Sequence, residues 1–174
     1  ALILAGLFTV CVMVYVPAEE FGRFSLAMAF IQTLDAAFLS LGNHALLRFG
    51  RERFSQFNEI GASLSARLLL FGIMIVILDG CIWVLRFYFP AVFQFGDAGL
   101  VVIVIGLIIV PLSEIGTYVA QATGRYVGYG MAPVIMRSVQ LFVLLVFVFY
   151  HNISWQLILF GTLFGHFLAG IYTW

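Results

Sequence analysis

Amide and ionisable side chains recur at helical spacing inside a long apolar stretch near the start of this sequence. At about 100° per residue, Gln32, Asp35 and Asn43 share one face of a helix. Ionisable groups at membrane depth are costly, and they usually face a bundle interior or a water-filled cavity. Asp35 stands near the middle of its stretch and has no basic partner along the same helix. We therefore expect its carboxyl group to be protonated or solvated and to line a path across a membrane.

Two later stretches carry similar polar faces. Glu114 and Gln121 share a face just beyond Pro111, whose missing N–H should kink the helix. Arg137 and Gln140 share a face on the next stretch. Glu114 and Arg137 lie at similar depth on consecutive antiparallel stretches, so they can pair as ions or contact a substrate or a coupling ion. The sequence leaves both interpretations open.

His166 is the polar residue of interest in the last stretch, where it stands between Gly165 and Gly170. It can be a hydrogen-bonded packing residue beside a face of small residues, or it can relay protons. Asp79 and Arg86 form a weaker candidate ion pair, because they are two helical turns apart, about 10 Å.

Covalent chemistry has one weak signature. The segment from Gly165 to Gly170 resembles the histidine helix of rhomboid intramembrane proteases, which use a Ser/His dyad. Such a protease needs its serine in a G-x-S-G turn, whereas Ser113 lies in the sequence Val110-Pro111-Leu112-Ser113-Glu114-Ile115. The sequence has no spacing typical of a phosphate-binding loop or a metal site. We therefore expect neither a catalytic site nor a cofactor.

Composition indicates the elements that must hold these residues. Of the 174 residues, 64% are hydrophobic and 9% are charged, and the mean hydropathy is +1.14. Backbone groups in hydrocarbon must be satisfied within the chain, so solidly apolar runs of about 20 residues predict membrane-spanning helices. Eight acidic residues balance eight basic ones, which gives no bulk attraction for nucleic acid. The predicted fold is an all-α polytopic membrane helix bundle.

We expect one six-helix unit over residues 1–174, with a polar break from Arg48 to Ser65 between its second and third spans. Both ends of the chain fall in apolar runs, so we expect it to be a fragment of a longer protein. The six expected spans are residues 1–16, 22–44, 66–88, 98–121, 130–150 and 155–174.

Arginines set the expected orientation, because short cytoplasmic loops hold an excess of basic residues. The second and fourth connections carry most of the arginines, and these connections are therefore predicted to be cytoplasmic, as is the N-terminus. The arginines on that side are Arg48, Arg51, Arg53, Arg67 and Arg125, against Arg23 and Arg86 on the other side.

Three short segments carry a resemblance to a known family. They are Val16-Pro17-Ala18-Glu19-Glu20-Phe21-Gly22-Arg23-Phe24, Leu41-Gly42-Asn43-His44-Ala45-Leu46-Leu47-Arg48-Phe49 and Gln121-Ala122-Thr123-Gly124-Arg125. The first resembles the "P-E-x-[FY]-G" turn, the second the "L-G-x-x-x-x-L-x-R" ending, and the third the "x-x-G-R" loop of polysaccharide-biosynthesis flippases of the MOP exporter superfamily.

The resemblance implies the N-terminal lobe of a transporter with about twelve to fourteen spans. Its members move a polyprenyl-pyrophosphate-linked oligosaccharide of the O-antigen type across the bacterial inner membrane by alternating access. The implied partners are this lipid-linked oligosaccharide, membrane lipids, H⁺ or Na⁺ as a coupling ion, and polysaccharide assembly proteins. The polar residues singled out above would then line the substrate path or couple ions.

A second branch of the same superfamily remains an alternative. A cavity for an anionic pyrophosphate should be cationic, yet Asp35, Asp79 and Glu114 all fall at membrane depth. These carboxyl groups fit a multidrug or cation exporter. In a flippase they would instead serve ion coupling, with Arg137 and His166 supplying positive charge.

Overall fold

The computed structural model describes residues 2–88, 95–150 and 153–174, and within these ranges every regular element is helical. The chain is an all-α bundle, as the composition predicted. Its elements, in chain order, are α1 (Leu2–Tyr15), α2 (Ala18–Leu34), the π-helix η1 (Asp35–Leu39), α3 (Asn43–Phe57), α4 (Gly61–Tyr88), α5 (Gly96–Ala122), α6 (Tyr126–Phe149) and α7 (Trp155–Thr173).

The lengths of these helices make the chain a multi-pass membrane protein. Within the described residues, the four helices α4, α5, α6 and α7 are long and apolar enough to cross a bilayer. The number of crossings rises to five if α2, η1 and α3 act as one broken span. The remaining helix, α1, is apolar but has only 14 residues. All six stretches predicted as spans are therefore helical over most of their length.

The second predicted span differs most from expectation, because it is broken rather than continuous to residue 44. The α-helix gives way to the π-helix at Asp35, where the Ser40 N–H donates to the Asp35 carbonyl at 2.8 Å. Gly42 then adopts a φ of +87°, a conformation that favours glycine. The chain turns there by 52° and continues as α3.

The expected polar break from Arg48 to Ser65 is helical over most of its length. Residues 43–57 form α3, and α4 already begins at Gly61. α3 is amphipathic: Leu46 and Gly50 are buried against the neighbouring helices, whereas its arginines are exposed. Leu46 and Gly50 are four positions apart, so they lie on the same face of the helix, and this face packs on the core although most other residues of α3 are polar or charged.

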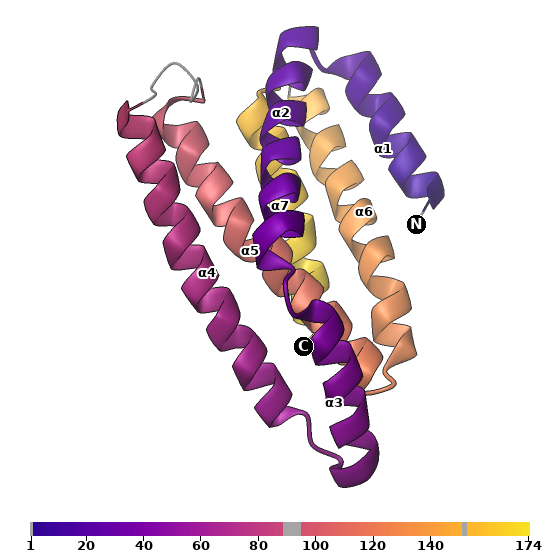
Figure 1. Ribbon diagram of the computed structural model, residues 1–174. Coiled ribbons are helices and arrows are strands. Elements are labelled where there is room, and N and C mark those ends of the chain that lie inside the picture. Colours follow the sequence, from indigo (N-terminus) through magenta and orange to yellow (C-terminus); the bar gives the residue numbers. More distant parts are fainter. Residues whose placement is uncertain (1, 89–94, 151–152) are drawn as a thin grey trace.

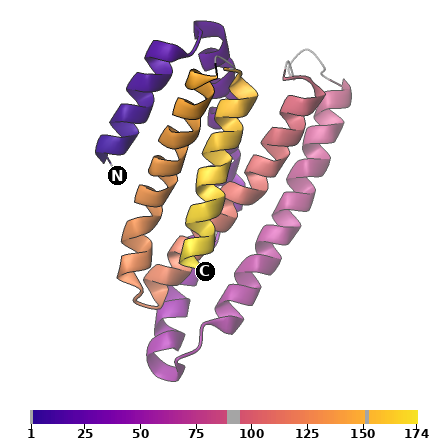
Figure 2. The ribbon, with the colours of Figure 1, turned by 180° about the vertical axis from the view of Figure 1, so that it is seen from behind.

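α7 forms the centre of the bundle together with α5 (Figure 1). It packs against α5, α6 and α2, while α1 lies on the outer side of α6 and α4 lies at the opposite edge. Figure 2 shows the same order from behind. α3 and the turn between α5 and α6 lie at one end of the molecule, and the turn between α1 and α2 lies at the other.

Glycines allow the close approach of α6 and α7. A Cβ atom at Gly161 would lie 2.6 Å from Val143 Cγ1, and one at Gly165 would lie 2.8 Å from the Met136 carbonyl oxygen. Helices in membranes associate through such small residues because packing, rather than exclusion of water, holds them together. This close contact turns the glycine face of α7 toward α6, and His166 follows Gly165 directly in the chain.

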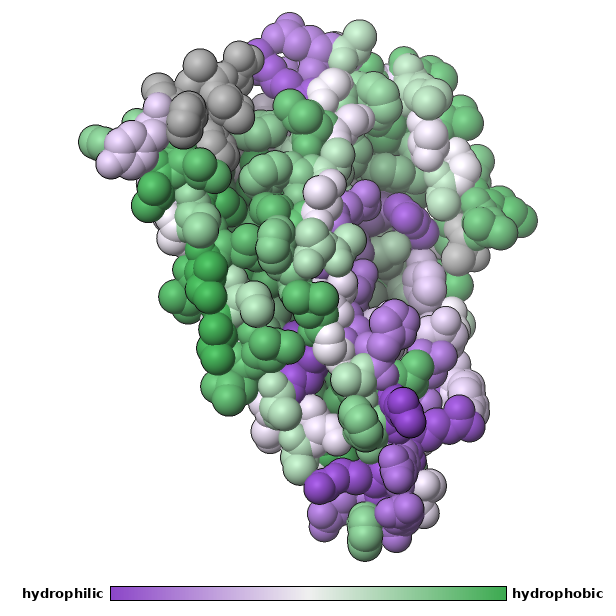
Figure 3. Space-filling view, in the orientation of Figure 1, coloured by the Kyte–Doolittle hydropathy of each residue, from purple (hydrophilic) through white to green (hydrophobic). Residues whose placement is uncertain are grey.

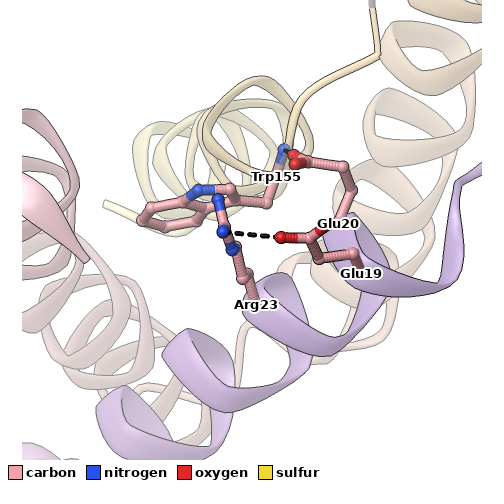
Figure 4. Close-up of polar contacts among 4 residues, drawn as sticks. All are labelled: Glu19, Glu20, Arg23 and Trp155. Carbon is pink, nitrogen blue, oxygen red and sulfur yellow. Dashed lines mark hydrogen bonds and ion pairs between the residues drawn. The ribbon is translucent and has the colours of Figure 1, made fainter. Parts of the chain in front are cut away.

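The start of α2 is tied to the start of α7 (Figure 4). The Trp155 backbone N–H donates to Glu20 Oε2 at 2.6 Å, and Arg23 donates to Glu19 at 2.7 Å. A carboxylate at a helix N-terminus satisfies a free N–H and complements the helix dipole. Glu19 and Glu20 thus have a structural role at this end of the bundle.

Candidate functional site

Arg67 holds the broken span from the neighbouring helix α4. Its Nε donates to Asn43 Oδ1 at 2.7 Å, and its guanidinium also donates to the carbonyl oxygen of Leu39, the last residue of η1. Helix ends leave carbonyls without intrahelical partners, and a positive charge near a helix C-terminus is favourable. Only 4% of Arg67 is exposed. Arg67 therefore caps the break from inside the bundle.

Two carboxyl groups lie near this arginine. Asp35, at the start of η1, is 5% exposed, and Glu114 on α5 is half-buried. Both interact electrostatically with Arg67 and with each other. We call Asp35, Asn43, Arg67 and Glu114 the central charge cluster. Several separate helices contribute to it, so it assembles only in the folded chain.

The central charge cluster retains hydrogen-bonding capacity. Among the described residues, Asp35 Oδ1, Asn43 Nδ2 and Arg67 Nη1 are buried and have no hydrogen-bond partner. Buried polar atoms in proteins are nearly always paired, so each such atom needs an explanation. Three of them in one cluster can bind a polar group, a water molecule or an ion.

A polar pocket of about 240 Å³ adjoins the cluster on the side of α5 and α6. Glu114 and Gln121, predicted to share a face, both line it, together with Thr117, Tyr118 and Tyr129. Tyr129 is a lining residue that sequence reasoning missed, because its position beside the turn between α5 and α6 carries no signal in the sequence. Glu114 thus belongs to both the pocket and the central charge cluster.

Gln32 is exposed on α2, one helical turn before Asp35, and Thr33 beside it is exposed as well. Hydrophilic surface extends from the middle of this face down to α3 (Figure 3). An amide on the outside of a membrane helix is unfavourable in contact with lipid tails. Gln32 is therefore suited to a face that meets water or another part of the protein.

Arg137 belongs to a second polar cluster, on α6 and α7. Its Nη1 donates to Gln140 Oε1 at 2.8 Å, and it also interacts electrostatically with His166. No ion pair between Glu114 and Arg137 forms among the residues that the structure describes, because the electrostatic partner of Glu114 is Arg67. Of the two interpretations left open by the sequence, the ion pair is not the one observed here, and Arg67, which lies inside the bundle, is the charged neighbour of Glu114.

His166 meets Ser113, with 3.2 Å between its Nδ1 and the serine Oγ. The same hydroxyl donates to the Val110 carbonyl at 2.8 Å, and a Cβ on Gly170 would lie 3.3 Å from the Ser113 Cβ. A nucleophilic serine must give its proton to the base and must be open to a substrate. Ser113 is buried under α7, so the contact fits the packing interpretation of His166.

The candidate pair of Asp79 and Arg86 is wrong. Arg86 instead forms an ion pair with Asp97 across the α4–α5 connection, and it lies over the Trp83 ring. Asp79 Oδ1 is buried and has no partner among the described residues. Asp79 lies on α4, outside the central charge cluster.

Arg67 is the residue whose expected position differs most from the observed one. The arginine count places it on the cytoplasmic flank, in the first turn of the third predicted span, but it lies about two helical turns inside α4. The apolar residues Ala62 and Leu64, which precede it, were the available signal that the helix begins earlier.

No family model matches the chain, and no curated protein or solved structure matches it significantly.

Proposed function

We propose that this bundle is a lobe of a transporter that flips a polyprenyl-pyrophosphate-linked oligosaccharide across the bacterial inner membrane. The observation that carries the proposal is the break in the second span with the central charge cluster built around it. Transporters typically build substrate and ion sites from discontinuous helices near the middle of the membrane. π-helical turns are also frequent at functional sites.

The polar groups of this face suit an oligosaccharide. Gln32 is exposed beside the break, and Tyr118, Gln121 and Tyr129 line the adjoining pocket. Amides and phenols both donate and accept hydrogen bonds, as sugar hydroxyls do. Arg137, which is only half-buried, supplies positive charge for a pyrophosphate. The lipid tail stays in the bilayer, so no closed cavity for it is required.

The acidic members of the cluster would couple transport to H⁺ or Na⁺. Asp35 has a free carboxylate oxygen, and Glu114 reaches both the cluster and the pocket. Binding a proton or a sodium ion here would change the charge that opposes Arg67. Such a change can bias the broken span between two arrangements.

The arginines favour a cytoplasmic location for the end that contains α3. Arg48, Arg51 and Arg53 lie on α3, and Arg125 lies at the turn between α5 and α6, which is at the same end (Figure 1). α1 then runs away from the cytoplasmic end, toward its turn with α2 at the opposite end (Figure 1). Translocation needs no covalent step, so the contact between Ser113 and His166 has a packing role here.

A multidrug or cation exporter of the same superfamily is the second candidate. It is favoured by the pocket that Glu114 lines together with two tyrosines, because carboxylates and aromatic faces both attract organic cations. The same residues would then bind substrate directly rather than couple an ion.

Substitution of Asp35 distinguishes these candidates. In cells that depend on this protein for surface polysaccharide, we expect Asp35→Asn to abolish the polysaccharide while membrane protein levels stay normal. Glu59→Gln, which removes an exposed carboxylate outside the cluster, is the matched control and should have no effect. Loss of drug resistance with intact polysaccharide would refute the flippase proposal in favour of the exporter.

A further inference from the structure

A groove of about 440 Å³ separates α3 from α4 at the arginine-rich end of the bundle. The residues along it change in character from one end to the other. Arg53 and Ser63 line the part near the α3–α4 turn. Leu46 and Leu70 line the part that extends toward the break at Gly42. The groove is thus polar at its mouth and mainly apolar further in, where Arg67 is the charged residue of its lining.

The mouth is suited to an anion. Arg53 is exposed on α3, and Ser63 lies in the first turn of α4, where backbone N–H groups have no intrahelical acceptor. Arg67 also lines the groove, one turn further inside. The acidic residues of this region, Glu52 and Glu59, do not line the groove. The mouth therefore offers the charge of Arg53 from α3 and the free N–H groups of the first turn of α4.

The inner part is suited to a hydrocarbon chain. Its walls include the exposed Phe49, and the small Ala62 and Ala66 keep the α4 side open. A chain that enters here passes from the end of the bundle toward the membrane interior. Basic pockets between membrane helices on the cytoplasmic side are suited to anionic lipid head groups.

We infer that this groove binds an anionic phospholipid, with its phosphate at Arg53 and Ser63 and an acyl chain along Ala66 and Leu70. Charge complementarity selects the head group, and the apolar wall selects a lipid over a soluble anion. A lipid seated here bridges α3 and α4 and so holds the broken span beside Arg67. The groove shares Arg67 with the central charge cluster, but the residues assigned to the lipid, Arg53, Ser63, Ala66 and Leu70, lie outside that cluster.

The test measures lipid binding to the purified full chain in a neutral detergent by native mass spectrometry. We expect phosphatidylglycerol to bind more tightly than phosphatidylcholine. Arg53→Gln should weaken phosphatidylglycerol binding about tenfold, since it removes a charge-assisted contact. Arg51→Gln removes the same charge from the same helix outside the groove, and it should change binding less than about twofold.

A second pair of variants tests the apolar part without changing charge. Ala66→Phe fills the groove and should abolish phosphatidylglycerol binding, whereas Ser65→Phe, at a neighbouring exposed position outside the groove, should not. Glycerol 3-phosphate alone should not compete, because it lacks the acyl chain. Equal binding of the two lipids, or equal losses in Arg53→Gln and Arg51→Gln, would overturn the inference. Competition by glycerol 3-phosphate would overturn it as well, because it would show a site for soluble anions.

Discussion

The broken second span and the continuous helix α7 both carry polar residues at membrane depth, yet they use them differently. On α7, Thr162 and Thr173 donate to carbonyls of their own helix at 3.0 and 2.8 Å, and His166 meets Ser113. In the broken span, Asp35 and Asn43 keep buried atoms without partners among the described residues. The state of the hydrogen bonds, rather than the presence of polar residues, separates a packing helix from a candidate path.

Loss of Arg67 should have the largest effect on this contrast. We expect Arg67→Met to destabilise the bundle by about 3–5 kcal/mol, because it leaves buried carboxylates and the Leu39 carbonyl uncompensated. Denaturation of the purified chain in detergent measures the change. Arg51→Met, at an exposed position on α3, is the control and should cost less than about 1 kcal/mol. Equal stability of the two variants would mean that the break is not held by Arg67.

The close contact of α7 provides the next test. A Cβ at Gly165 would lie 2.8 Å from a backbone oxygen, which cannot move without shifting α6. We expect Gly165→Ala to cost about 1–3 kcal/mol of unfolding free energy. Gly80→Ala is the matched control, since a Cβ at that position would meet nothing within 4 Å and alanine favours a helix. A neutral Gly165→Ala would show that α6 and α7 are not closely packed.

Substitution of Gly42, in the turn of the broken span, should have a smaller effect on stability. Its φ of +87° is strained for any residue with a side chain, so Gly42→Ala should cost about 1–2 kcal/mol. Gly72→Ala, where a Cβ meets nothing within 4 Å, is the reference. Thermal unfolding of both variants checks the difference. A Gly42→Ala protein as stable as the Gly72→Ala protein would argue that the span is continuous.

Ser113 should give the smallest effect. Ser113→Ala removes the hydroxyl that donates to the Val110 carbonyl and meets His166, and it should cost about 1 kcal/mol. Surface polysaccharide should stay within about twofold of the normal amount, because a packing contact of that size leaves the folded population high. Labelling of Ser113 by a fluorophosphonate, or a complete loss of activity in Ser113→Ala, would instead point to a nucleophile.

Much of the fold follows from local sequence, because apolar length decides which segments form membrane helices. The fourth predicted span, residues 98–121, corresponds to α5 (Gly96–Ala122), and the sixth, residues 155–174, corresponds to α7 (Trp155–Thr173). The face shared by Glu114 and Gln121 also emerged from spacing alone, and both residues line one pocket.

The break in the second span could not be predicted from local apolar length. The residues of η1 are as apolar as those of an ordinary helix, apart from Asp35, so no local pattern distinguishes them. At the break, Arg67, which is distant in sequence, supplies the partner for the Leu39 carbonyl. Side-chain pairs such as Glu114 with Arg67 are likewise properties of the packed bundle rather than of one helix.

The accessibility of Gln32 to water tests most directly whether the face of the broken span lines a path. Cysteines would be introduced as Gln32→Cys and, on the apolar outer face of α4, as Val76→Cys, after replacement of Cys11 and Cys81 by alanine. In native membranes, a water-soluble thiol reagent should modify the Gln32→Cys protein rapidly and the Val76→Cys protein very slowly, because only a hydrated thiol ionises readily. Equal protection of both positions would place Gln32 away from water and contradict the account.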